Sequence, residues 1–347
     1  MGPDIEALAE HFAGSPATFT TSALYRSLCP VVADDPATLE LLTHRRTGQQ
    51  ACYLFFGVVH RLLLGGAPHR LGDFYPSVVG GAARDPASAG PVLIDFCRQY
   101  RDELVTLIRT RLVQTNVVRR AVALRYALWA VGRHCDGPVH LVEVGASAGL
   151  LLLVDRYRYL VGDAEFGDPH ATVTLRTEWR GRQTLPDLDR VPPIASRIGV
   201  DLNPVDVADA EDRRWLRALV WPEDLAEAAL LDASLDLVAS ARPTVIAGDA
   251  VDICPTLDLP AGEPRVVFHA ATRMHVPAQR RPAFDAAIDS LGRDGPLYHA
   301  WLEPAIAPHH PYRAEHDRVL SMHGPDNAVP IPLVQADGHV YWLEPLD

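Results

Sequence analysis

The chain contains no lysine, because all 32 of its Lys and Arg residues are arginine. Lysine forms the Schiff base with pyridoxal phosphate and completes the Gly-Lys-Ser/Thr phosphate loop, so both kinds of site are excluded. The five cysteines are also scattered, with no Cys-x-x-Cys pair among Cys29, Cys52, Cys97, Cys135 and Cys254. We therefore expect neither a structural zinc site nor a disulfide framework, as suits a protein of a reducing cytoplasm.

Long apolar runs and an excess of basic charge are missing as well. No stretch of eighteen or more apolar residues occurs, so we expect no transmembrane helix and no membrane partner. The first residues, MGPDIEALAEHFAG, carry early acids and do not resemble a secretory signal. The formal net charge of -12 disfavours a nucleic-acid surface. The expected partner is a small-molecule substrate, and the oligomeric state stays open.

Residues 1–135 predict a helical N-terminal domain that caps the rest and binds substrate. The segment DDPATLELLTHR opens with a helix-start signal, and QQACYLFFGVVHRLLL predicts a buried helix. Two further segments, residues 91–113 and 116–134, repeat apolar residues at spacings of three and four. Residues 65–90 are rich in Gly and Pro and predict a long loop, which is either a functional element or a simple linker.

Residues 136–347 predict a second domain, in which short apolar strands alternate with helices. The expected strands are VHLVEVG, ASRIGVDLNP, PTVIAGDAVD, EPRVVFHAATRMHVP and PLYHAWLEP. Helices are expected over residues 148–162, 209–240 and 277–295, a hairpin insertion over about 160–195, and a terminal hairpin turning at Asp337-Gly338. This alternation predicts an α/β fold with a doubly wound, Rossmann-like sheet. A terminal antiparallel hairpin on such a sheet is typical of the class I methyltransferase fold.

The stretch LVEVGASAGLLLL, residues 141–153, supports two hypotheses. Gly145-Ala146-Ser147-Ala148-Gly149 matches Gly-x-Ser-x-Gly, the turn that presents a nucleophilic serine in hydrolases. Such hydrolases have strands before this turn, whereas here a helical region precedes it. The dinucleotide fingerprint would require glycine at Ser147 and Leu150, so a nicotinamide cofactor is disfavoured.

The alternative is a cofactor loop that follows a strand ending in Glu143. Its backbone N–H groups and the following helix N-terminus would face the negative end of a ligand. For S-adenosylmethionine this end is the amino-acid carboxylate. The expected cofactor-binding residues of this loop are Glu143, Gly145, Ala146, Ser147 and Gly149.

Two further acidic residues follow the next two expected strands. Asp201, with Leu202 beside it, is expected to hold the ribose hydroxyls of S-adenosylmethionine. It lies much further along the chain than the ~20 residues of a compact unit, which the expected insertion explains. Asp249 and Ala250 are expected near the adenine. The alternative for Asp201 and Asp249 is that each merely caps a helix.

Several long motifs resemble the bacterial domain-of-unknown-function 2332 family: FYPSVVGG, RLVQTNVVRRAVAL, LVEVGASAGLLLLVDRYRY, IGVDLNPVDVADAEDRRWLRALVWPED, VIAGDAVD and VVFHAATRMHVP. The resemblance covers most of the chain, and the family is similar to class I S-adenosylmethionine-dependent methyltransferases in its C-terminal half. It therefore implies that fold and cofactor. The chain departs from the family pattern at Val117, where an acid is usual, and at Met274-His275, where Gln-Tyr is usual. Both departures fall where substrate is expected.

Four residues are candidates for the chemistry of methyl transfer. His269 ends the fourth strand of this region and His275 lies just beyond it, where a base near neutral pH is useful. Tyr75 and Asn116 are polar residues in segments expected near the cleft. The alternatives are a core role for His269, a surface loop for His275 and a helix cap for Asn116.

We expect no metal site. His309, His310 and His316 cluster in PHHPYRAEH, but they lack helical spacing and nearby paired acids. The function expected from the sequence is methyl transfer from S-adenosylmethionine to a small molecule. The alternatives are a binder of S-adenosylmethionine or another nucleoside without methylation, and a hydrolase that uses Ser147.

Overall fold

The computed structural model describes residues 3–114, 116–304 and 318–346. The segment with His309, His310 and His316 lies outside them. The α-helices are α1 (Pro3–Gly14), α2 (Ala23–Ala33), α3 (Pro36–Leu42), α4 (Ala51–Leu64), α5 (Pro76–Val79), α6 (Gly90–Gln99), α7 (Arg101–Thr110), α8 (Arg120–Gly132), α9 (Ala210–Ala218), α10 (Leu225–Ala241), α11 (Ala250–Ile253) and α12 (Arg281–Asp289). Among the described residues, no helix combines the length and apolar character needed to cross a membrane.

Within the described residues, the strands form one sheet of eleven, in the order β3-β2-β4-β11-β10-β9-β8-β7-β1-β5-β6. They are β1 (Val139–Val144), β2 (Arg158–Val161), β3 (Ala164–Gly167), β4 (Thr174–Trp179), β5 (Ile194–Asp201), β6 (Thr244–Ala247), β7 (Arg265–Ala270), β8 (Leu297–Glu303), β9 (Arg318–Gly324), β10 (Asn327–Ala336) and β11 (Trp342–Pro345). The five expected strands correspond to β1, β5, β6, β7 and β8. β9 was not expected from the sequence.

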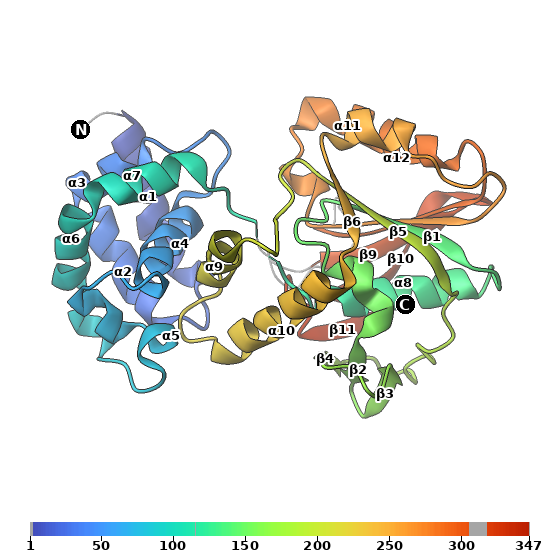
Figure 1. The fold of residues 1–347 in the computed structure, drawn as a ribbon, viewed down its shortest axis with the longest axis horizontal. Coiled ribbons are helices and arrows are strands. Elements are labelled where there is room, and N and C mark those ends of the chain that lie inside the picture. The colour runs from blue at the N-terminus through green and yellow to red at the C-terminus, as the bar shows by residue number, and fades with distance from the viewer. Residues whose placement is uncertain (1–2, 115, 305–317, 347) are drawn as a thin grey trace. The chain divides into compact units, whose positions relative to one another are not determined.

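The chain divides into two compact units (Figure 1). The helical unit comprises residues 1–115 and 208–232, and the sheet unit comprises residues 116–207 and 233–347. The boundary expected at residues 135 and 136 is therefore displaced. Helix α8 belongs to the sheet unit because its residues are buried almost all round and pack on β7, β8 and β9. Helix α9 belongs to the helical unit because it packs along α4.

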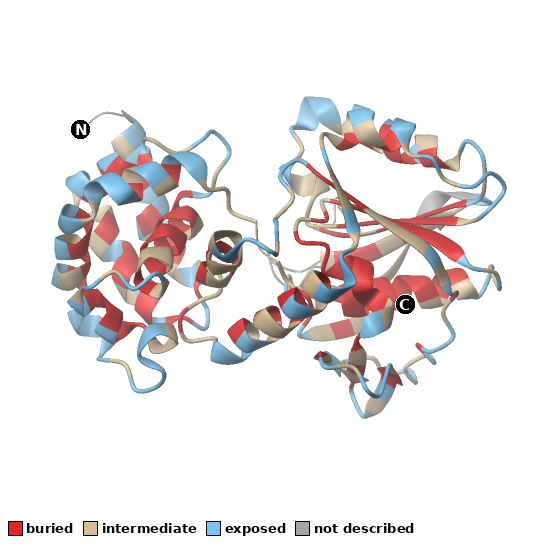
Figure 2. Ribbon diagram, in the orientation of Figure 1, coloured by how far each residue is buried: buried red, intermediate tan, exposed pale blue. Residues whose placement is uncertain are grey.

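Helix α4 is the centre of the helical unit. Ten of its residues are buried, as its apolar sequence predicts (Figure 2). Gly57 lets α9 approach closely, since a Cβ there would lie 3.1 Å from the Trp215 ring. The Gly/Pro-rich segment after α4 is more ordered than the expected loop. It forms a 3-10 helix over Arg70–Phe74 and the short helix α5, and it buries Tyr75 completely.

The centre of the sheet is parallel, in the order β6-β5-β1-β7-β8. Helices α11 and α12 cover one face, where Val142, Val200 and Val267 pack against Phe284 and Ile288. Helix α8 packs on β7, β8 and β9 from the opposite face (Figure 1). Parallel strands with helices on both faces make this a doubly wound, Rossmann-like sheet, as the alternating sequence predicts.

Antiparallel strands extend the parallel centre. β9 pairs with β8, β10 with β9, and β11 with β10. The expected terminal hairpin is confirmed in β10 and β11, where the Asp337 carboxylate accepts the backbone N–H groups of His339 and Tyr341. The Asp337 side chain organises the turn by accepting backbone N–H groups that do not take part in the pairing of the two strands.

The segment after β1 differs from the prediction. A helix was expected over residues 148–162, but only a 3-10 helix, Leu151–Arg156, forms before β2 begins at Arg158. The Tyr157 and Tyr159 side chains are fully buried there. The expected insertion contains a hairpin of β2 and β3, whereas β4 pairs in parallel with β2 and with β11.

Candidate functional site

The site lies at the carboxyl ends of the parallel strands. From β1 the chain proceeds to β5 and β6 on one side, and then returns to β7 and β8 on the other. The strand order therefore reverses between β1 and β7. Ligands of open α/β sheets bind in the crevice outside the strand ends at such a switch point. The two loops that meet there are residues 145–149 after β1 and residues 271–275 after β7.

The two loops touch at Gly145. Its φ is +81°, and a Cβ at this position would lie 2.2 Å from Thr272 Oγ1. Two residues other than glycine also have left-handed backbones in these loops, with φ values of 49° at Ser147 and 52° at Ala271. Such strain costs free energy and persists where the surroundings enforce it, which is common at functional sites.

The loop of residues 145–149 is folded onto the protein. The N–H group of Gly145 donates to Val200 O at 2.7 Å, and that of Gly149 donates to Ala146 O at 2.7 Å. The Ser147 N–H donates to Asp201 Oδ2 at 2.8 Å. The Ala146 N–H also donates to Val200 O, at 3.3 Å. The expectation that these N–H groups face a ligand carboxylate is therefore wrong for these four positions. The missing α-helix after the loop removes the helix-dipole contribution as well.

Asp201, the last residue of β5, braces the loop. Its Oδ2 accepts the Ser147 N–H and its Oδ1 accepts the Asn203 N–H, both at 2.8 Å. The carboxylate is 8% exposed. Hydrogen bonds from backbone N–H groups to a carboxylate are charge-assisted, so Asp201 fixes the relative position of the ends of β1 and β5. It does not cap a helix.

Glu143 is buried in β1 beneath the loop. It is 3% exposed, and its Oε2 has no hydrogen-bond partner. Burial raises the pKa of the Glu143 carboxyl well above 4.5, and the nearby Asp201 charge raises it further. A buried polar atom without a partner costs free energy, so this acceptor is suited to a donor that arrives with a ligand.

Replacing Glu143 with glutamine is expected to increase the free energy of unfolding at pH 7–8. The raised pKa means that the folded wild type holds the proton more tightly than the unfolded chain does. The wild type therefore loses stability as pH rises from 4.5 through the folded pKa, and glutamine avoids this loss. Denaturant unfolding between pH 4 and pH 8 measures the difference, which should vanish toward pH 4. The exposed Glu10→Gln is the control, and an equal response of both variants would contradict the prediction.

Asp249 lies after β6 and caps a helix, as the alternative hypothesis for this residue predicts. Its Oδ1 accepts the Val251 N–H at 3.0 Å and thereby caps α11. Its Oδ2 also forms an ion pair with Arg280 at 2.9 Å. Ala250 is the first residue of α11 and is buried. Capping and cofactor binding are compatible, but the cap and the ion pair already engage both oxygens of this carboxylate.

At the ends of β7 and β8, Glu303 organises the second loop. Its Oε1 accepts from His269 Nδ1 and from the N–H groups of Thr272 and Arg273, each at 2.8 Å. Burial raises the pKa of Glu303, but these hydrogen bonds outweigh burial and bring the pKa below 4.5. Glu303 and Thr272 were missed from the sequence. The signal for Glu303 was the same as for Glu143, an acid at the end of an apolar strand.

The two candidate histidines differ in accessibility. His269 is 1% exposed and packs on Phe284 and Trp301. It therefore supports the loop from below through Glu303. His275 is exposed, in the 3-10 helix Arg273–His275. Burial of part of its ring lowers the pKa of His275 despite the opposing Glu303 charge.

Arg120, at the start of α8, supplies a cation to this region. Desolvation and the nearby Arg318 together lower the pKa of Arg120 to about 10, against the opposing charges of Glu303, Asp337 and Glu143. No specific signal for Arg120 is visible in the sequence, because its position among these acids depends on how α8 packs on the sheet.

Ser147 and Asn116 are neighbours, although 31 positions separate them. Asn116 Nδ2 donates to Ser147 Oγ at 3.0 Å. Asn116 is not the N-cap of α8, which begins at Arg120 after the N-cap Arg119. A serine nucleophile needs a base at its hydroxyl, and an amide cannot accept that proton. This contact supplies no base for Ser147 and therefore gives the hydrolase hypothesis no support, whereas a strained turn at Ser147 fits both hypotheses.

Tyr75 lies in the aromatic core of the helical unit. Its ring contacts Tyr25 and His60, with centroid distances of 6.3 Å and 5.3 Å. Burial raises the pKa of Tyr75 well above 10. A side chain with no exposed surface does not contact a substrate in this conformation, so we do not include Tyr75 in the site.

The chain belongs to the family described as "Uncharacterized protein conserved in bacteria (DUF2332)", which matches residues 7–344. No curated protein matches the chain. A similar solved structure is magnesium protoporphyrin IX methyltransferase from Synechocystis PCC 6803 with bound SAH. The match has 12% identity and a TM-score of 0.25, and it covers 61% of this chain and 67% of that chain.

Two further solved structures are similar. The bifunctional kinase-methyltransferase WbdD has 13% identity and a TM-score of 0.28, over 79% of this chain and 44% of that chain. An S-adenosylmethionine-dependent methyltransferase from Clostridium acetobutylicum ATCC 824 has 9% identity and a TM-score of 0.24, over 70% of this chain and 78% of that chain. Because all three TM-scores are below 0.5, we base the function on the residues of the site.

Proposed function

We propose that this member of the DUF2332 family binds S-adenosylmethionine at the carboxyl ends of β1, β5 and β6 and transfers its methyl group to a small molecule. One observation carries the proposal. Four of the five parallel strands have a carboxylate within two residues of their carboxyl ends: Glu143, Asp201, Asp249 and Glu303. These acids surround the switch point, where this type of sheet binds its ligands.

The charge of the site distinguishes between a cationic nucleoside cofactor and an anionic dinucleotide. S-adenosylmethionine carries an ammonium, a sulfonium and a carboxylate, so it is a net cation. A dinucleotide carries phosphates, which need N–H groups or a helix N-terminus. Here four loop N–H groups are used internally, and a 3-10 helix replaces the α-helix. The carboxylates of Asp201 and Glu303 therefore favour the cationic cofactor over an anionic one.

Individual residues suit parts of this cofactor. The unpartnered Oε2 of Glu143 is an acceptor for a cationic or N–H group. Asp201, with the exposed Leu202 beside it, would hold the ribose hydroxyls and offer an apolar surface to the base. Leu202 is 67% exposed, so its apolar side chain is accessible to a ligand. Gly145, Ala146, Ser147 and Gly149 form the loop between these groups, and Asp249 and Ala250 follow β6 near the proposed adenine position.

The bound cofactor would supply an electrophilic methyl group. The chain's contribution is to align the acceptor and to remove its proton where necessary. His275 is the base that we propose, because it is exposed just beyond β7 and its lowered pKa keeps the imidazole neutral near pH 7. His269 is a positioning residue that acts through Glu303 on the 271–275 loop. Asn116 positions Ser147.

Calorimetric titration of the full chain tests the proposal. We expect S-adenosylmethionine and S-adenosylhomocysteine to bind with dissociation constants below millimolar, and NAD⁺ not to bind. Transfer of a labelled methyl group to a small-molecule extract then separates a methyltransferase from a protein that only binds the cofactor. Failure of the wild-type protein to bind S-adenosylmethionine at millimolar concentration would refute the proposal.

The Ser147→Ala variant distinguishes this function from a serine hydrolase. We expect affinity for S-adenosylmethionine to change by less than ~10-fold, because the loss is one neutral hydrogen bond of about 1 kcal/mol. A nucleophile would instead lose nearly all turnover on an ester substrate, by several orders of magnitude. Covalent labelling of the wild-type serine by a fluorophosphonate, absent in Ser147→Ala, would favour the hydrolase.

A further inference from the structure

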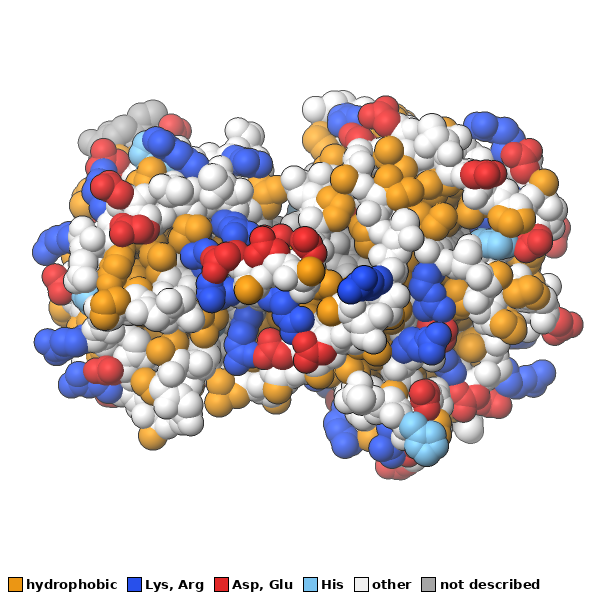
Figure 3. Space-filling model, viewed as in Figure 1, with side chains coloured by type: hydrophobic (Ala, Val, Ile, Leu, Met, Phe, Trp, Pro, Cys, Tyr) orange, Lys and Arg blue, Asp and Glu red, His pale blue; other side chains and the backbone are white. Residues whose placement is uncertain are grey.

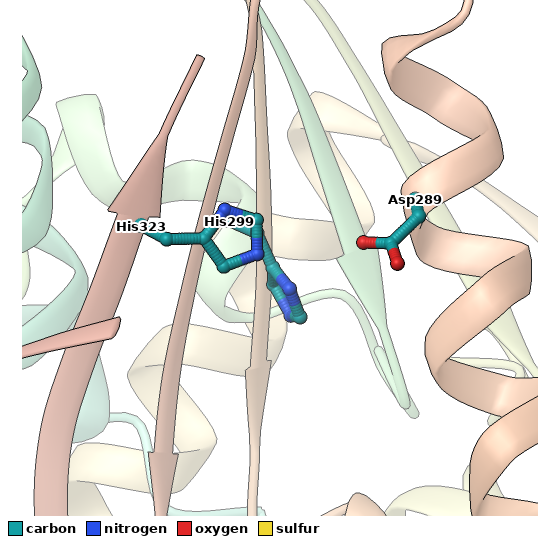
Figure 4. A group of neighbouring side chains, drawn as sticks. All are labelled: Asp289, His299 and His323. Atoms are coloured by element: carbon teal, nitrogen blue, oxygen red, sulfur yellow. The ribbon is translucent and has the colours of Figure 1, made fainter. Parts of the chain in front are cut away.

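Three side chains with metal-binding atoms meet on the face of the sheet that α12 covers. His299 of β8 and His323 of β9 are directly opposite each other in the antiparallel pair. Directly opposite residues project to the same face, so both rings lie on one side. Asp289, the last residue of α12, points its carboxylate toward them (Figure 4). One donor atom from each residue lies within 4.8 Å of the others.

The group is compact enough to hold one ion. Donors bound to a zinc ion at about 2.0–2.1 Å in a tetrahedron are roughly 3.3 Å apart. Moving the present atoms from at most 4.8 Å to that separation requires side-chain rotation. Asp289 is exposed and His323 is only partly buried, so both have room to turn. The β8–β9 pairing fixes the two backbones from which the rings project.

His299 gives independent support for a ligand. It is 7% exposed, and its Nε2 is buried with no hydrogen-bond partner. A buried ring nitrogen without a partner costs free energy, and a bound metal ion would satisfy it.

The group is also open to solvent on one side. Asp289 and His323 line a surface pocket of about 410 Å³, together with Gly292, Gly295 and Gly324. The glycines contribute no side chains to this wall. An ion could enter from the pocket, and a water or a small ligand could occupy a coordination position that the protein leaves vacant.

We propose that Asp289, His299 and His323 bind a divalent transition-metal ion of the zinc type, with a remaining coordination position facing the pocket. Two imidazoles and one carboxylate suit Zn²⁺ and related ions, whereas Mg²⁺ and Ca²⁺ prefer oxygen ligands. The group lies near the start of β8, whereas the proposed cofactor residues follow strand ends. The metal ion would therefore not occupy the proposed cofactor position.

Cobalt titration of the full, chelator-treated chain tests this proposal. We expect one Co²⁺ per chain, with the visible absorption of a four- or five-coordinate site, and displacement by Zn²⁺ measured by calorimetry. Asp289→Asn and His323→Ala should each weaken Co²⁺ binding at least ~10-fold, because each removes a group that binds the ion directly. Loss of a residue that only hydrogen-bonds to a ligand already lowers metal affinity by about 10–100-fold. Both residues are at the surface, so the variants should fold, which circular dichroism checks.

Two control variants locate the ion. His134→Ala removes an exposed histidine after α8 and should leave binding unchanged. The double variant His309→Ala/His310→Ala removes the histidines that cluster in the sequence and should also bind normally. No Co²⁺ binding by the wild type, equal binding by Asp289→Asn and His323→Ala, or loss of binding in the double variant would each overturn the proposal.

Discussion

Replacing Gly145 with alanine is expected to lower the free energy of unfolding by roughly 2–5 kcal/mol. The left-handed backbone, with φ +81°, accounts for about 1–2 kcal/mol of this loss in a residue with a Cβ. The remainder is steric, at about 1–3 kcal/mol for an overpacked site, because the Cβ would meet Thr272 Oγ1 at 2.2 Å and Cγ2 at 2.7 Å. Denaturant unfolding of the full chain measures the change.

Gly262→Ala is the matched control for Gly145→Ala. Gly262 has φ +79°, but no heavy atom lies within 4 Å of an added Cβ. This variant therefore contains the backbone strain without the steric contact. Adding Thr272→Ala to Gly145→Ala should recover part of the lost stability, since it removes the two closest atoms. If Gly145→Ala costs no more than Gly262→Ala, the loops after β1 and β7 are not in close contact.

Replacing Asp201 with alanine is expected to weaken binding of S-adenosylmethionine by ~10-fold to ~100-fold. The carboxylate holds the Ser147 and Asn203 N–H groups, and a hydrogen bond to a charged group contributes about 1.5–3 kcal/mol. Its removal releases the loop after β1 and also removes the proposed ribose contact. Titration calorimetry measures the affinity, and the melting temperature shows whether the variant is folded.

Asp168→Ala is the control for Asp201→Ala. Asp168 also accepts a backbone N–H, from His170 at 2.8 Å, but it is exposed in the turn after β3. We expect this variant to bind S-adenosylmethionine like the wild type. A folded Asp201→Ala variant with unchanged affinity would remove Asp201 from the cofactor site and leave it a purely structural role.

The distribution of charged side chains on the surface bears on the type of partner that the protein binds. On the face shown in Figure 3, acidic and basic side chains are interspersed, and neither sign forms a continuous field. A small-molecule acceptor does not require such a field, whereas nucleic-acid binding depends on a concentrated basic surface. The absence of a nucleic-acid partner stays a prediction, which a salt-dependent binding assay with duplex DNA would test.

The local sequence determined where the parallel strands lie and which acidic residues are found at their carboxyl ends. Apolar runs such as VHLVEV are buried on both faces in parallel sheets, so they can be read without knowing their neighbours. The positions of Glu143 and Asp201 at strand ends followed from the same runs. The Asp337 turn was also predictable, because an Asp side chain organises the backbone within a few residues of itself.

Tertiary packing decided the rest, because the relevant partners are distant in the sequence. Residues 148–162 have a helical pattern, yet β2 forms there because it pairs with β3 and β4 and buries Tyr157 and Tyr159. Glu303 holds His269 from 34 positions away, and His299 meets His323 only through the β8–β9 register. Periodicity reports which face a residue occupies, whereas strand register and helix packing select the residues that meet across that face.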